Sequence, residues 1–196
     1  MKKLKNRFIV PAVVFILGMC ALIGAIYVVG KSQEQQNRTN AKLNAMTYAE
    51  RIKGELMEGI GVTDTLKQVV ISGDGNINKF YDIAANMMDD SIQSIQIAPN
   101  GVVTEIYPEE GNVSGKIDLI NDSDRGEISR YARDNDTVIM QGPFELKQGG
   151  YGIAVRNPVY LKNENGQKSF WGFTIVILKV PEIFSDSVEA LSSFGY

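Results

Sequence analysis

One arginine within an apolar segment is the side chain of this sequence best suited to binding chemistry. Arg156 lies in GIAVRNPVY, residues 152–160, where most of the other side chains are apolar. A charge in such a segment must reach solvent, pair with an acid or meet an anionic ligand. Two interpretations stay open. Arg156 points outward or pairs with an acid such as Asp118, or its guanidinium binds a ligand carboxylate through two hydrogen bonds.

The other candidate binding residues are large apolar and aromatic side chains in segments near Arg156. A half-open sheet backed by a helix leaves a concave face that can hold a small molecule. For Trp171, packing in the core or at a sheet edge is the alternative to stacking on a ligand. The predicted ligand-binding residues are Tyr107, Phe144, Leu146, Arg156, Tyr160, Trp171 and Phe173.

The residue inventory argues against catalysis. The sequence has no His, and its single Cys is Cys20. Histidine-based catalysis, histidine or cysteine metal sites and an intramolecular disulfide are therefore excluded. The acid pairs Glu109–Glu110 and Asp122–Asp124 lie in polar segments, where they are expected to be solvated. We predict no catalytic residue, no enzymatic activity, no metal site and no cofactor.

Charge is distributed unevenly along the chain. The net charge is −3, from 20 basic and 23 acidic residues. Lys2, Lys3, Lys5 and Arg7 precede the first apolar run, and the first acid is Glu34, so the remainder is more acidic than the total suggests. Nucleic-acid binding needs a basic face, so we predict no nucleic-acid partner.

Residues 8–30 form an uncharged apolar run. At about 1.5 Å per residue, a helix of this length crosses a hydrocarbon core of about 30 Å. A cleaved signal peptide is the alternative, but the run is longer than a usual signal-peptide core. The basic residues before it place the N-terminus in the cytoplasm. We predict a single-pass protein of the cell membrane with its remaining chain extracytoplasmic.

Four regions are expected along the chain: a cytoplasmic tail (1–7), a transmembrane helix (8–30), a helical stalk with packing helices (31–90) and a sensory core (91–196). Apolar side chains recur every three or four residues in the stalk, which therefore packs on its own domain or pairs with a second copy. The second interpretation predicts a homodimer through the stalk helix. Gly59 and Gly61 are expected to end this helix, with Thr63 capping the next one.

The remaining segments alternate between strand and helix patterns. Residues 91–97 and 102–107 read as a hairpin around Asn100-Gly101, with a phase shift near Ser94. Further strands are expected at 137–141, 144–146, 151–160 and 170–180, with a hairpin turn at 163–166. Helices are expected at 76–88, 124–134 and 181–192. This order predicts an α+β fold, a PAS-like five-stranded antiparallel sheet behind a long N-terminal helix and preceded by one transmembrane helix.

Several short pieces within residues 91–183 carry a family resemblance. They are Tyr107-Pro108 with Gly111-Asn112, Gly142-Pro143 before a strand, Leu146-x-Gln148-Gly149-Gly150-x-Gly152 followed by Arg156-x-Pro158-Val159-Tyr160, and Phe170-Trp171-Gly172-Phe173. In this order and spacing they resemble a CHASE domain. The resemblance implies an extracytoplasmic domain that binds a small molecule and relays to a cytoplasmic histidine kinase or diguanylate cyclase.

The family resemblance also implies two flanking membrane helices, the second of which would follow Tyr196. The chain is therefore expected to be part of a receptor, or a stand-alone sensor that signals through a partner. Two other functions stay open: a Cache-like sensor of another family, and a non-sensory envelope interaction protein.

Overall fold

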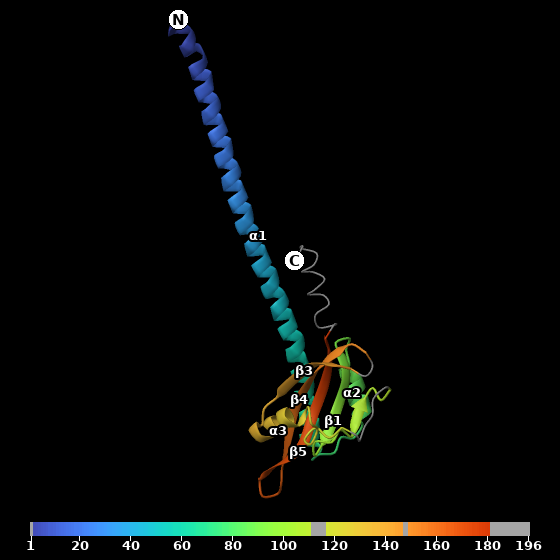
Figure 1. Ribbon diagram of the computed structural model, residues 1–196. Coiled ribbons are helices and arrows are strands. Elements are labelled where there is room, and N and C mark those ends of the chain that lie inside the picture. Colours follow the sequence, from blue (N-terminus) through green and yellow to red (C-terminus); the bar gives the residue numbers. More distant parts are fainter. Residues whose placement is uncertain (1, 111–116, 147–148, 181–196) are drawn as a thin grey trace. The chain divides into compact units, whose positions relative to one another are not determined.

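The structure is a computed structural model that describes residues 2–110, 117–146 and 149–180 (Figure 1). The chain divides into two compact units, Met1–Tyr48 and Ala49–Tyr196. The predicted helix at 181–192 lies outside the described residues. The elements are α1 (Lys2–Ser72), α2 (Phe80–Met87), β1 (Ile92–Pro99), β2 (Glu105–Tyr107), α3 (Gly126–Asn135), β3 (Ile139–Glu145), β4 (Tyr151–Lys162) and β5 (Lys168–Lys179).

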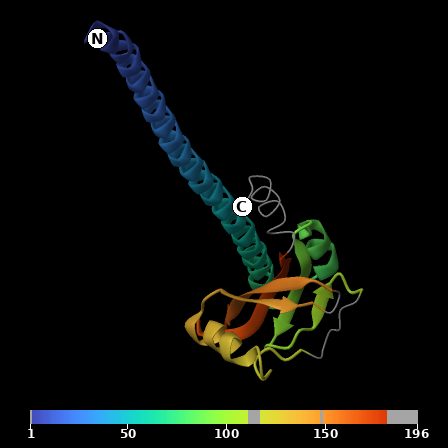
Figure 2. The ribbon, with the colours of Figure 1, turned by 45° about the horizontal axis from the view of Figure 1, so that its top comes forward.

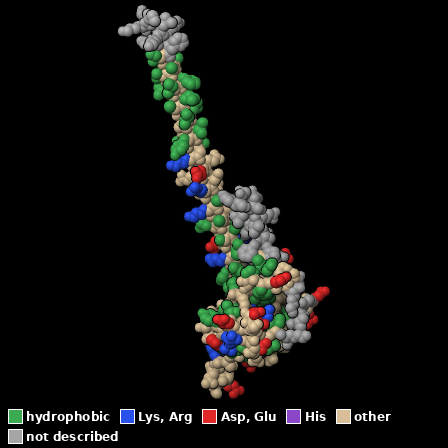
Figure 3. Space-filling view, viewed as in Figure 1, with side chains coloured by type: hydrophobic (Ala, Val, Ile, Leu, Met, Phe, Trp, Pro, Cys, Tyr) green, Lys and Arg blue, Asp and Glu red, His purple; other side chains and the backbone are tan. Residues whose placement is uncertain are grey.

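The first unit is the N-terminal part of α1. Its large apolar side chains from Ile9 to Val29 are exposed, and Figure 3 shows them as a nearly continuous hydrophobic surface. By length and composition this segment can cross a membrane, although a signal sequence would meet the same criterion. Pro11 lies inside the helix, beyond its first turn, so it removes one backbone hydrogen bond of α1.

The predicted break at Gly59 and Gly61 is wrong. Helix α1 includes both glycines, and the Thr63 hydroxyl donates to the carbonyl of Ile60 within the helix instead of capping a new one. Glycine inside a helix costs about 1 kcal/mol relative to alanine, but Gly59 is where the helix approaches Leu178 closely. A Cβ on Gly59 would lie 2.8 Å from Cδ1 of Leu178. Tertiary packing against Leu178 therefore outweighs the tendency of glycine to end a helix.

The five strands form one antiparallel sheet in the order β2-β1-β5-β4-β3 (Figure 2). This arrangement confirms the predicted α+β fold class, with a five-stranded antiparallel sheet behind a long N-terminal helix. The four predicted regions do not coincide with the two structural units, and their boundaries stay predictions.

The first face of the sheet is covered by the C-terminal part of α1 and by α2. Leu66 of α1 and Phe80 of α2 pack there on Ile95, Val155 and Val176 of the three central strands. These side chains are at most 1% exposed, so the first core is closed to solvent.

The apolar stripe of α1 divides between two environments. Ile52, Leu56 and Ile60 are partly buried against the first core. Leu43 and Met46 are each 56% exposed. The stripe thus packs on its own domain in its later part, and its earlier part leaves an apolar surface uncovered.

The second face is covered by α3 and by the segment just before it. Ala132 of α3 and Leu119 pack there on Ala154, Phe173 and Ile175. In Figures 1 and 2, α3 lies beside β3 and β4, whereas α2 lies beside β1 and β2. The two short helices also belong to different cores, so they cover opposite faces of the sheet.

The sequence predicted the turns well and the ends of the strands less well. Asn100 and Gly101 have positive φ angles of 52° and 85°, as the β1–β2 turn requires, and the phase shift near Ser94 is a register irregularity between Ile92 and Ser94. The segments 137–141 and 144–146 belong to one strand, β3, whose pairing shifts between Gln141 and Phe144. Helix α2 begins four residues later than predicted, at Phe80.

Candidate functional site

Strand register places Arg156 at the centre of the second face. Arg156 pairs with Ile175 of β5 on one side and with Ile139 of β3 on the other. Ile175 in turn pairs with Gln96 of β1. Directly paired residues of antiparallel strands point to the same face, so Arg156 and Gln96 flank Ile175 beneath the second core.

Arg156 is buried and lacks an acidic partner. It is 2% exposed, and its Nη1 donates to Oε1 of Gln141 at 2.6 Å, whereas its buried Nε has no partner. Within the described residues no carboxylate forms an ion pair with it, and Asp118 instead accepts hydrogen bonds from Ile120 and Asn121. The interpretation in which Arg156 points outward or pairs with Asp118 is therefore wrong.

The surroundings of Arg156 disfavour its charge. Burial, the largest effect, and the positive charge of Arg125 lower the pKa of the guanidinium, Asp122 partly offsets them, and the resulting pKa is about 10. Asp122 is engaged elsewhere, because it pairs with Arg125 at 3.0 Å. At neutral pH Arg156 remains a buried cation, and its one hydrogen-bond partner in the described part of the chain is the neutral amide of Gln141.

A second unpartnered polar atom lies on the helix that covers this face. Ser129 is fully buried, and its Oγ has no hydrogen-bond partner. Gly126, Ser129 and Ala132 are the buried residues of α3, and Ala132 belongs to the second core, so Ser129 lies on the sheet-facing side of the helix. An unsatisfied buried polar group costs about 1–3 kcal/mol.

The predicted binding residues divide between the two faces. Phe144, Leu146 and Phe173 pack in the second core, on the face of Arg156. Tyr107 and Trp171 instead pack against the first core. One pocket on a single face cannot include all seven residues, because the sheet separates the two sets.

Tyr160 connects the second core to the surface. Its hydroxyl donates to the carbonyl of Arg133, the ring lies 5.6 Å from that of Phe170, and Phe170 lies 5.0 Å from Phe173. Burial raises the pKa of the Tyr160 phenol, so it stays protonated and able to donate. The aromatic chain runs from the buried Phe173 to a surface pocket that Tyr160 lines.

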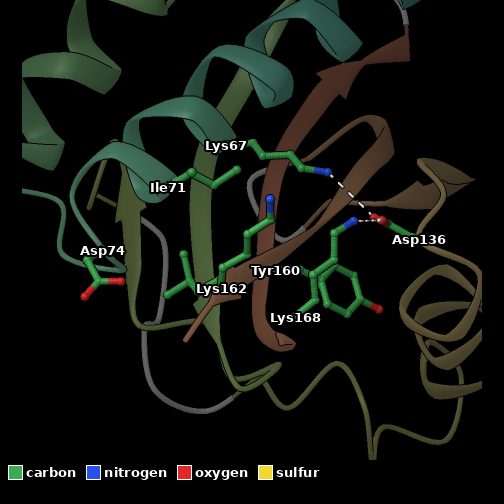
Figure 4. A pocket seen from close by; sticks show the side chains of 8 residues that line it. Lys67, Ile71, Asp74, Asp136, Tyr160, Lys162 and Lys168 are labelled. Carbon is green, nitrogen blue, oxygen red and sulfur yellow. Dashed lines mark ion pairs between the residues drawn. The ribbon is translucent and has the colours of Figure 1, made fainter. Parts of the chain in front are cut away.

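That surface pocket has a volume of about 360 Å³ and lies within the second unit (Figure 4). The last turns of α1, the residue after α3, the end of β4 and the start of β5 converge on it. Its lining residues are Lys67, Ile71, Asp74, Asp136, Tyr160, Leu161, Lys162 and Lys168.

Helix α1 is attached to the first face by a buried polar layer. Asn157, which is 1% exposed, donates to Oδ1 of Asp64 at 2.6 Å and accepts from Nζ of Lys67 at 3.1 Å. Thr174, its partner on β5, donates to the carbonyl of Thr63 at 2.9 Å. Asn157 follows Arg156 directly, so neighbouring residues of β4 contact the two faces. Across the described residues, no cluster of three or more acidic or cysteine side chains could hold a metal ion.

The comparisons with known proteins identify the family. The model of the CHASE domain matches residues 34–194, most of the chain. The chain belongs to the CHASE domain family. It therefore carries an extracytoplasmic sensory domain and not a catalytic one. The match begins well before the predicted resemblance at residues 91–183 and includes much of α1.

One solved structure shares the fold of this chain. An extracellular ligand binding receptor from Desulfohalobium retbaense DSM5692 superposes with a TM-score of 0.58 and 12% sequence identity. The aligned region covers 76% of this chain and 26% of the receptor, so the chain spans about a quarter of its length. No sequence among the curated proteins matches this chain.

Several residues of the candidate site and of the surface pocket were not predicted from the sequence. Ser129 and Gln141 approach the second face from α3 and β3. The spacing of Gly126, Ser129 and Ala132 is a weak helical signal that could have indicated Ser129. Among the lysines of the surface pocket, Lys162 and Lys168 flank the predicted hairpin turn and pair across it, whereas Lys67 has no such signal because it lies about a hundred residues away.

Proposed function

We propose that this CHASE domain is the ligand-sensing part of a membrane-anchored receptor and that its ligand is a small molecule with a carboxylate. In this proposal the apolar run of α1 anchors the chain with its N-terminus in the cytoplasm. The sensory unit lies outside and relays to a cytoplasmic histidine kinase or diguanylate cyclase. The early part of the stalk, which exposes Leu43 and Met46, pairs with a second copy.

The proposal depends on two buried polar groups beneath α3 that have no hydrogen-bond partner in the described part of the chain. Arg156 retains a buried N–H without an acceptor, and Ser129 retains a buried hydroxyl without a partner. A carboxylate would supply negative charge to a cation whose partner among the described residues is the neutral Gln141, and its oxygens would be acceptors for such buried donors. The surrounding apolar side chains, among them Phe144 and Phe173, would contact the remainder of the ligand.

Strand β4 offers a route from this ligand to α1. Arg156 would contact the ligand on one face, and Asn157 holds α1 through Asp64 and Lys67 on the other. A ligand that prefers one position of β4 would therefore shift the balance of α1 conformations. The shift can be no larger than the differential affinity of the ligand for the two states, typically about 1–3 kcal/mol.

The test measures thermal unfolding of the full chain in detergent micelles against a panel of small carboxylic acids. We expect at least one acid to raise the unfolding temperature of the wild type, to have no effect on Arg156→Met, and to bind Ser129→Ala more weakly. Arg38→Met is the matched control, since Arg38 is exposed and pairs with Glu34 on α1. A shift that persists in Arg156→Met, or no shift with any acid, would refute the proposed ligand class.

A further inference from the structure

The surface pocket at the end of α1 gathers more positive charge than the described residues neutralise. Three ammonium groups, from Lys67, Lys162 and Lys168, lie at one pocket lined by two carboxylates. Figure 4 shows Lys67 and Lys168 approaching Asp136 and Asp74 at the opposite end of the pocket. Lys162 lies between them (Figure 4). Lys162 and Lys168 pair across the β4–β5 hairpin, and the fold brings Lys67 of α1 to them.

Asp136 forms only long ion pairs, with two of the three lysines. Its two oxygens lie 3.8 Å from Nζ of Lys67 and 3.6 Å from Nζ of Lys168. Both separations are longer than a hydrogen bond. Lys67 donates one hydrogen bond, to Asn157 at 3.1 Å. Lys162 is exposed and has neither an ion pair nor a hydrogen bond to any part of the chain that the structure describes. Each ammonium therefore has donors available for a ligand.

The pocket also has an apolar side. Ile71 is 40% exposed, and Leu161 and the ring of Tyr160 line the same space. A volume of about 360 Å³ falls in the range of small-molecule sites, about 300–1,000 Å³. This is far larger than a bare inorganic anion needs. The lining thus fits a ligand with a charged head and an apolar or aromatic body.

We propose that this lysine pocket (Lys67, Lys162 and Lys168 with Ile71, Tyr160 and Leu161) is a second binding site, for a small organic phosphate. Lysine acts on phosphate as a point charge, whereas the flat fork of arginine suits a planar carboxylate. Three ammonium groups from different directions fit a tetrahedral group that carries nearly two negative charges. The site is separate from that of Arg156, which lies beneath the second core.

The lysine pocket gives such a ligand direct access to α1. Lys67 belongs to α1 and also bonds Asn157, the residue through which β4 holds this helix. An organic phosphate on Lys67, Lys162 and Lys168 would tie the end of α1 to the β4–β5 hairpin. It would therefore act as a second input on the helix that the Arg156 ligand is proposed to move.

The experiment is calorimetric titration of the full chain in micelles with phenyl phosphate, beside inorganic phosphate and benzoate. In Arg156→Met, which lacks the proposed carboxylate site, we expect phenyl phosphate to bind at one site and more tightly than either comparison compound. Lys162→Ala and Lys168→Ala should each weaken it about tenfold, as expected for the loss of a hydrogen bond to a charged group. Lys42→Ala removes the same charge from an exposed position outside the pocket and should leave the affinity unchanged.

Several results would overturn the proposal that the lysine pocket binds an organic phosphate. These are no saturable binding of phenyl phosphate, equal weakening by Lys42→Ala, and, in Arg156→Met, benzoate or inorganic phosphate binding as tightly as phenyl phosphate. Arg156→Met separates the two proposals, because it should abolish carboxylate binding and preserve phenyl phosphate binding. Loss of phenyl phosphate binding in Arg156→Met, with full binding in Lys162→Ala, would place the phosphate at Arg156 instead.

Discussion

Replacing Arg156 by methionine should stabilise the ligand-free protein while abolishing its response to ligand. The wild type holds a cation in an apolar layer where it is 2% exposed and bonds a neutral amide. Methionine fills a similar volume without a charge. Replacing buried ionic groups by packed apolar ones is commonly neutral or stabilising, by about 1–4 kcal/mol.

The magnitude follows from the electrostatics of the site. Burial and Arg125 lower the pKa of Arg156 to about 10, which corresponds to a cost of about 3 kcal/mol for the charged form in the folded state. The substitution also removes the hydrogen bond to Gln141, with a loss of about 1–2 kcal/mol. The expected net gain is about 1–2 kcal/mol, or an unfolding temperature about 2–8 °C higher.

Unfolding of the sheet unit can be followed through the fluorescence of Trp171, the single tryptophan, which packs against the first core. Urea titrations of wild type, Arg156→Met and the exposed control Arg38→Met would give the differences in free energy of unfolding. The control should match the wild type. Unfolding of Arg156→Met at markedly lower urea would show that Arg156 is structural, and the reasoning about a ligand partner would fail.

The pH dependence gives an independent check of the same reasoning. Because the pKa of Arg156 is lower in the folded state, the cost of its charge is fully present below pH 10. Above that pH the unfolded state binds more protons, so the wild type gains stability relative to the variant. The advantage of Arg156→Met should therefore shrink as pH rises past 10. An advantage that is constant across this range would indicate a packing effect instead.

Two further predictions concern α1. Gly54 has nothing within 4 Å of an added Cβ, whereas at Gly59 the Cβ would lie 2.8 Å from Leu178. Gly54→Ala should therefore raise the free energy of unfolding by up to about 1 kcal/mol, and Gly59→Ala should lower it by about 1–3 kcal/mol. The same sign for both in urea titrations would contradict the packing argument. Asn157→Ala removes the buried amide that holds Asp64 and Lys67 and should cost about 1–3 kcal/mol. The exposed Asn86→Ala should stay within about 0.5 kcal/mol of the wild type, and equal unfolding curves for the two variants would mean that the polar layer does not hold α1.

Much of the fold was predictable from the sequence because its signals are local. The uncharged run at residues 8–30, the turn at Asn100-Gly101 and the apolar alternation of β1 each depend on a few neighbouring residues. The family could be inferred in the same way, from short pieces in a fixed order. Even the irregularity near Ser94 appeared in the sequence, as a change in the phase of the alternation.

The site depends on contacts that no local pattern contains. Sequence singled out Arg156 as a charge in an apolar strand, but the pairing of β4 with β3 and β5 determined that it is buried beside Gln141. The same pairing placed Tyr107 and Trp171 on the opposite face. Gly59 continues the helix because of Leu178, and Lys67 meets the hairpin pair Lys162 and Lys168 only when α1 packs on the sheet. The backbone preferences that set turns and strands act over a few residues, whereas burial and charge pairing depend on which distant segments the folded chain brings together.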